Sequence, residues 1–81
     1  MFTTNLELLE KYIKESGYKR EYLAKALGLS RASFIYRMRG TRDFTITEVY
    51  KLSMILNLSE RDIINIFFPR RVSNLNVLQT I

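Results

Sequence analysis

The sequence predicts an all-α fold of five helices, and three observations support this prediction. Apolar residues recur three and four positions apart in successive segments, which is the spacing of one helix face. Most of these segments follow a Ser or Thr and end at a Gly or Pro, the residues that start and stop helices. Before Pro69 no run alternates between polar and apolar residues as a half-buried strand would.

Length and composition indicate one small globular domain. The chain has 81 residues, of which 47% are hydrophobic and 26% charged, and a chain of this size can fold on its own core. We expect a domain over residues 1–69 and a C-terminal tail over residues 70–81.

The first helix is expected over residues 5 to 16. Thr4-Asn5-Leu6-Glu7 has the form of a capping box, with Thr4 as the N-cap and Glu7 reaching back to it. Gly17 is a natural stop, because it can take the left-handed conformation that ends a helix.

The second and third helices are short and close together. The second is expected from about Arg20 to Leu27 and ends at Gly28. Ser30 can cap a third helix from about Arg31 to Met38, which Gly40 ends in the same way.

Two more helices follow. Thr45-Ile46-Thr47-Glu48 repeats the capping-box form before an apolar stripe made by Val49, Leu52, Ser53 and Leu56. After a turn at Asn57-Leu58, Ser59 and Asp62 can start a fifth helix that Pro69 brings to an end.

The tail after Pro69 has no helix signal and loosely alternates. Three interpretations stay open at this point: a frayed terminus, a strand, or an arm that packs on a partner.

The composition argues against catalysis. The chain has no Cys and no His, which removes disulfides, thiolate metal sites, the commonest metal ligand and the commonest general base. No pair of carboxylates is spaced in a way that suggests a shared site. We therefore expect no enzymatic activity, no metal and no cofactor.

The sequence also gives no sign of a membrane segment. No run approaches the roughly 18 apolar residues of a membrane span, and the N-terminal segment mixes acidic and basic residues, unlike a signal peptide. These features predict a cytosolic protein.

The formal net charge of +5 and the pI near 9.8 favour a polyanionic partner. Between positions 19 and 42 a single acid, Glu21, stands against seven basic residues: Lys19, Arg20, Lys25, Arg31, Arg37, Arg39 and Arg42. One side of the molecule should therefore be cationic.

The segment LAKALGLSRASFIYRMRG, residues 23–40, has the features of a helix-turn-helix. Two short helices can cross closely only with a small residue in the first helix and a Gly in the turn, and Ala24 and Gly28 stand four apart in these roles. The predicted structural residues of the motif are Leu23, Ala24, Leu27, Gly28, Leu29, Phe34 and Met38.

The second helix of this motif is suited to the major groove of DNA, which is about 12 Å wide and accepts one helix. Its outward residues are expected to be short at the start and cationic further on. The predicted base-contacting residues are Arg31, Ala32, Ser33, Tyr36 and Arg37. The predicted phosphate-contacting residues are Lys19, Arg20, Lys25, Arg39, Thr41 and Arg42.

Roughly residues 5 to 68 resemble the phage repressor and Cro family of helix-turn-helix proteins, especially the small Cro-like regulators of temperate phages. The resemblance is carried by LAKALGLSRASF, by RMRG and by DFTITEVYKLSMILNLSERDI. It implies a compact five-helix, lambda-repressor-like DNA-binding domain with the helix-turn-helix at the second and third helices, acting in a lysis–lysogeny switch. Arg20 stands where the family usually has a phosphate-contacting Gln, and Met38 and Arg39 stand where many relatives have an acid.

The partners expected are double-stranded DNA and a second copy of the chain, because a dimer reads two half-sites. Ile46, Tyr50 and Met54 form a second stripe on the fourth helix. It is either partly buried under the fifth helix or the tail, or part of a subunit interface with Phe67, Phe68 and the tail. A function of another class stays open: an antirepressor or modulator that binds another phage regulator protein through the helix-turn-helix scaffold or the tail.

Overall fold

The computed structural model describes residues 4–69, and within them the all-α prediction is confirmed. The expectations for the tail at residues 70–81 lie outside the described residues. The described chain forms five helices in the order α1 (Leu6–Ser16), α2 (Arg20–Ala26), α3 (Arg31–Met38), α4 (Ile46–Ile55) and α5 (Glu60–Phe67).

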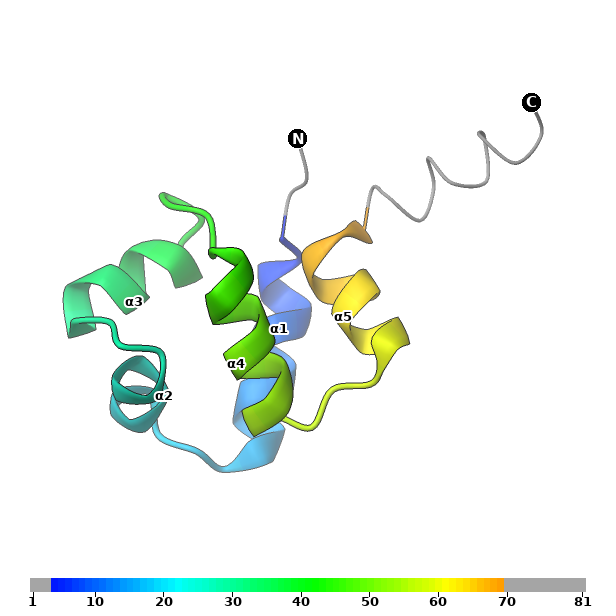
Figure 1. Cartoon of the computed structure of the whole chain (residues 1–81), viewed down its shortest axis with the longest axis horizontal. Helices are drawn as coiled ribbons and strands as arrows, with labels where there is room; N and C mark the ends of the chain where they lie inside the picture. Colours follow the sequence, from blue (N-terminus) through cyan, green and yellow to red (C-terminus); the bar gives the residue numbers. More distant parts are fainter. Residues whose placement is uncertain (1–3, 70–81) are drawn as a thin grey trace.

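Two groups of helices make up the molecule (Figure 1). The pair α2 and α3 lies at one end, while α1, α4 and α5 lie together at the other. A shared apolar core joins the groups, because its buried residues come from every helix: Leu9, Ile13, Leu23, Ala24, Leu27, Phe34, Leu52, Ile66 and Phe67. The arrangement is a compact lambda-repressor-like fold.

Three N-caps form as the sequence predicts. Ser30 accepts a hydrogen bond from the amide of Ser33 and starts α3. Complete capping boxes start α4, between Thr45 and Glu48, and α5, between Ser59 and Asp62. These caps satisfy amides that would otherwise have no partner in the helix.

The predicted cap of α1 is wrong by one residue. The N-cap is Asn5, whose side chain accepts the amide of Leu8 at 3.1 Å, and not Thr4. The amide of Asn5 also donates to the carbonyl of Ile66 at 2.6 Å. This second bond links the start of α1 to α5, and a local sequence pattern does not contain it.

Helices α2, α3 and α4 all end in the same backbone motif. The residue after each C-cap has a positive φ: 73° at Gly28, 81° at Gly40 and 54° at Asn57. The next amide then returns to a carbonyl five residues earlier, as Leu29 does to Ala24 at 2.9 Å. This is the Schellman motif, and it turns the chain sharply while satisfying carbonyls at the helix end.

A hydrogen bond from a tyrosine on α1 connects that helix to the start of α5. The hydroxyl of Tyr12 donates to Oδ1 of Asp62 at 2.7 Å, while Oδ2 accepts the amide of Ser59. The Tyr12 hydrogen bond, followed by the bonds from Ser59, lowers the pKa of Asp62 below its ordinary value. The same bond to Asp62 raises the pKa of Tyr12.

Candidate nucleic-acid interface

The packing between α2 and α3 fixes the direction of α3. Leu23 is fully buried and Phe34 nearly so, and Ala24 and Leu27 are also in the core. Leu29 and Met38 are partly buried against it. Together with the Schellman turn at Gly28, this packing holds α3 at the edge of the domain, where one of its faces is open to solvent.

Five residues of α3 and its C-cap form one exposed stripe. They recur at positions one and four apart, as residues on one helix face do, and they are Arg31, Ala32, Ile35, Tyr36 and Arg39. Helix α3 contains no acidic residue, so this face carries positive charge and neutral groups only. We call this set of five the α3 face.

Ile35 belongs to the α3 face, although sequence reasoning missed it. Its side chain is 36% exposed, between Arg31 and Arg39 along the helix. The spacing of four residues between these positions was a signal that could have found it. An exposed apolar group here can contact a thymine methyl in the major groove.

Ser33 lies beside the α3 face and is only partly exposed. Its hydroxyl accepts a hydrogen bond from the hydroxyl of Ser30 at 3.0 Å, and its amide donates to the same Ser30 oxygen. Ser33 therefore takes part in the N-cap of α3.

The prediction that Arg37 faces outward is wrong. Its side chain is only 12% exposed, and its Nε donates to Oε1 of Glu48 at 2.6 Å. A second guanidinium nitrogen, Nη1, donates to the carbonyl of Ser33 at 3.3 Å. The buried carboxylate at the start of α4 draws the guanidinium inward, so Arg37 is not on the surface that would meet base edges.

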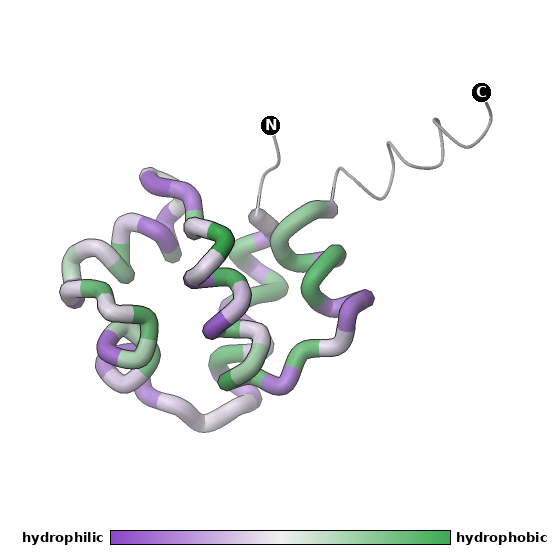
Figure 2. Tube along the Cα trace, in the orientation of Figure 1, coloured by the Kyte–Doolittle hydropathy of each residue, from purple (hydrophilic) through white to green (hydrophobic). Residues whose placement is uncertain are grey.

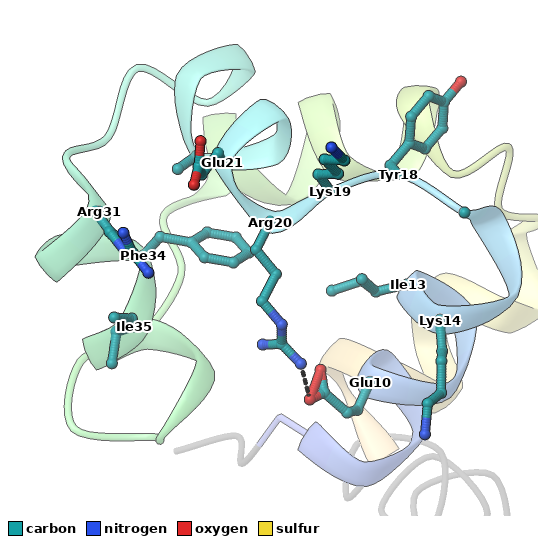
Figure 3. A pocket seen from close by; sticks show the side chains of 12 residues that line it. Glu10, Ile13, Lys14, Tyr18, Lys19, Arg20, Glu21, Arg31, Phe34 and Ile35 are labelled. Carbon is teal, nitrogen blue, oxygen red and sulfur yellow. Dashed lines mark hydrogen bonds and ion pairs between the residues drawn. The ribbon is translucent and has the colours of Figure 1, made fainter.

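A cavity of about 640 Å³ opens between α1, α2 and α3 (Figure 3). Three predicted DNA-contacting residues line it, namely Lys19, Arg20 and Arg31, and Lys14 of α1 adds a cation that sequence reasoning did not include. Apolar side chains of the core, Ile13 and Phe34 among them, also line it. Two acids, Glu10 and Glu21, line it as well. The structure thus brings the starts of α2 and α3 together around one hollow in which four cations outnumber two acids.

Arg20 crosses this cavity to an acid on α1. Figure 3 shows its guanidinium reaching Glu10, with which it forms an ion pair and a hydrogen bond. Both side chains are well exposed, at 55% and 42%. A DNA phosphate would have to compete with Glu10 for Arg20. Because both side chains are exposed, a phosphate can reach the guanidinium.

The remaining predicted phosphate contacts do not line the cavity. Lys25 is exposed in the last turn of α2, and Arg39, Thr41 and Arg42 are exposed at the end of α3 and in the loop after it. Figure 2 shows that this loop is hydrophilic. The amides of Thr41 and Arg42 both donate to the carbonyl of Tyr36, at 2.9 and 3.3 Å, and hold the loop beside α3.

An exposed, acid-free helix held by a tight glycine turn against a preceding short helix is the arrangement of a helix-turn-helix DNA-binding protein. A family model described as helix-turn-helix matches residues 9–63, which is more than half of the chain. The chain belongs to this family, whose members are regulators of the Cro and repressor type, and it is a DNA-binding transcriptional regulator. No curated protein and no solved structure matches it.

Two further observations concern other classes of site. Within residues 4–69 no helix is both long and apolar enough to cross a membrane. The same residues contain no group of three or more His, Cys, Asp or Glu side chains that could hold a metal ion.

Proposed function

We propose that this protein is a sequence-specific, Cro-like or repressor-like regulator that inserts α3 into the major groove of phage-type operators. It would act by occupying the operator, without catalysis. The observation that carries the proposal is the α3 face, which is exposed, free of acids and held by a packed turn. We assign base contacts to Arg31, Ala32, Ile35 and Tyr36, with Ser33 at the edge of the contact surface.

Phosphate contacts are assigned to the exposed cations around the α3 face. Lys19 and Arg20 stand at the start of α2, where a free helix end and cationic side chains favour an anion. Arg39, Thr41 and Arg42 would follow the backbone past the end of α3. Lys25, in the last turn of α2, completes the set.

Two alanine variants that remove one positive charge each test the division into base and phosphate contacts. DNA selected from a random pool by the wild-type protein serves as the operator, and a random duplex serves as the reference. Replacing Arg31 by Ala should reduce discrimination between the two duplexes by about 1–3 kcal/mol. Replacing Arg42 by Ala should weaken binding to both equally and reduce the salt slope by about 1.

Because both variants lower the net charge by the same amount, a difference between them cannot come from overall attraction. If both lose discrimination in parallel, the assignment of Arg31 to bases is refuted. If the wild-type protein enriches no sequence from the pool, sequence-specific binding itself is refuted.

The proposal includes a homodimer, because a single α3 reads one half-site and two copies read sites about 34 Å apart. The second stripe of α4 supports this part of the proposal: Ile46, Tyr50 and Met54 are 79%, 64% and 66% exposed. Within residues 4–69, α5 therefore does not bury these three side chains. Sedimentation of the protein with selected DNA should give two chains per operator, and one chain per operator would refute the dimer.

The same stripe favours a second candidate function, that of an antirepressor or modulator that binds another regulator protein. Large apolar side chains at this exposure are typical of protein–protein contacts, and Tyr and Met are enriched there. A mobility-shift assay on the promoter region next to this protein's gene, with and without a candidate partner regulator, separates the two functions. A complex that forms without DNA, together with no shift by this protein alone, would favour the modulator.

A further inference from the structure

The carboxylate of Glu48 forms a junction between two helices, α3 and α4. Its Oε1 accepts Nε of Arg37 on α3 at 2.6 Å and the amide of Thr45 at the N-cap of α4 at 3.1 Å. Arg37 in turn donates to the carbonyl of Ser33, one helical turn earlier on α3. One oxygen thus connects the last turn of α3 with the first turn of α4.

This junction is buried. The side chains of Arg37 and Glu48 are only 12% and 9% exposed, whereas the Arg20–Glu10 pair is largely in solvent. A charge in such a place must be paired and hydrogen-bonded, which restricts where its partner can lie. The two helices are therefore held in one relative position at this point, and apolar contacts alone would allow more freedom.

We infer that Arg37 is a positioning residue for DNA recognition, which acts through Glu48 and does not touch DNA. This inference rests on the proposed function of α3. Arg37 and Glu48 lock the rotation and depth of α3 relative to α4, so that the whole α3 face meets the base edges in register. Loss of the lock would affect every base contact at once, while loss of a base-reading side chain would affect one base pair.

The main test is the double variant Arg37→Met with Glu48→Gln. It removes one positive and one negative charge, so the net charge of +5 is unchanged and nonspecific attraction to DNA is preserved. Gln at position 48 can still accept the amide of Thr45 and keep the capping box. The matched control is Glu7→Gln with Lys11→Met on the exposed surface of α1, which removes one negative and one positive charge away from the junction.

Binding is measured at a temperature where circular dichroism shows each variant to be folded. The targets are DNA selected by the wild-type protein, the same DNA with each base pair changed singly, and a random duplex. We expect the junction variant to lose discrimination about tenfold, spread over all positions of the half-site, with an unchanged salt slope. The control variant should match the wild type.

A second variant, Arg37→Lys, keeps a positive charge beside Glu48. It therefore gives a result even if the double variant does not fold. It should lose less discrimination than the double variant, again over all positions. Unchanged discrimination in the double variant would overturn the inference, and so would a loss confined to one base pair, which would make Arg37 a base reader. Failure of the proposed function gives a different result, since the wild-type protein would then select no DNA.

Discussion

The buried ion pair between Arg37 and Glu48 predicts a distinctive pattern of stability in three variants. Replacing Arg37 alone by Met leaves the Glu48 carboxylate with the amide of Thr45 as a neutral donor, and replacing Glu48 alone by Gln leaves the Arg37 charge with neutral acceptors in place of a carboxylate. Breaking a fully buried pair typically costs about 3–5 kcal/mol, and this largely buried pair should cost toward the lower end of that range. Since a domain of this size is stable by about 4–12 kcal/mol, each single variant should lose a large share of its free energy of unfolding.

The double variant should be more stable than at least one of the single variants, by about 2 kcal/mol, because no unpaired charge remains. Denaturant unfolding followed by circular dichroism gives all four free energies of the cycle. The exposed pair provides the comparison, and Glu10→Gln should cost at most about 1 kcal/mol because solvent screens that pair. The reasoning is refuted if each single variant at the Arg37–Glu48 pair loses no more free energy of unfolding than Glu10→Gln does. It is also refuted if the double variant loses as much as the two single variants together.

Two further predictions concern the turn and the response to acid. Gly28→Ala should destabilise the domain by about 1–2 kcal/mol, because φ is 73° there although the added methyl meets no atom within 4 Å; a gain in stability by thermal unfolding would contradict this. The lowered pKa of Asp62 means that its stabilising contribution is present above the ordinary value of 3.8 and is lost as the pH falls through the folded value. The gap in stability between the wild type and Tyr12→Phe should therefore narrow as the pH falls from about 5 to about 2, and a constant gap in urea unfolding would count against the hydrogen bond.

Most of the fold could be predicted because its signals are local. The capping boxes at Thr45 and Ser59 and the turns at Gly28 and Gly40 depend on residues only a few positions apart. Such pairs are held together by the helix itself, so the sequence pattern is enough to find them. The exposed start of α3, with Arg31, follows from the same signals.

The parts that could not be predicted depend on contacts between elements. The bond from Asn5 to α5 links the start of α1 to a distant element, and the burial of Arg37 depends on an acid eleven positions along the chain. Charge made Arg37 look exposed, and Ile35 was not among the residues expected at the surface of α3. For Arg37 the neighbouring helix α4 decides where the side chain lies, and its charge alone gives the opposite answer.

One side of helix α4 packs on the rest of the molecule and the other side faces solvent. This difference has a consequence for regulation. On the inner side Glu48 pairs with Arg37 of α3. On the outer side the stripe of Ile46, Tyr50 and Met54 is exposed. A protein that binds the outer side and tilts α4 would also tilt α3. By thermodynamic reciprocity, DNA would then change the affinity for that protein by the same factor by which the protein changes the affinity for DNA.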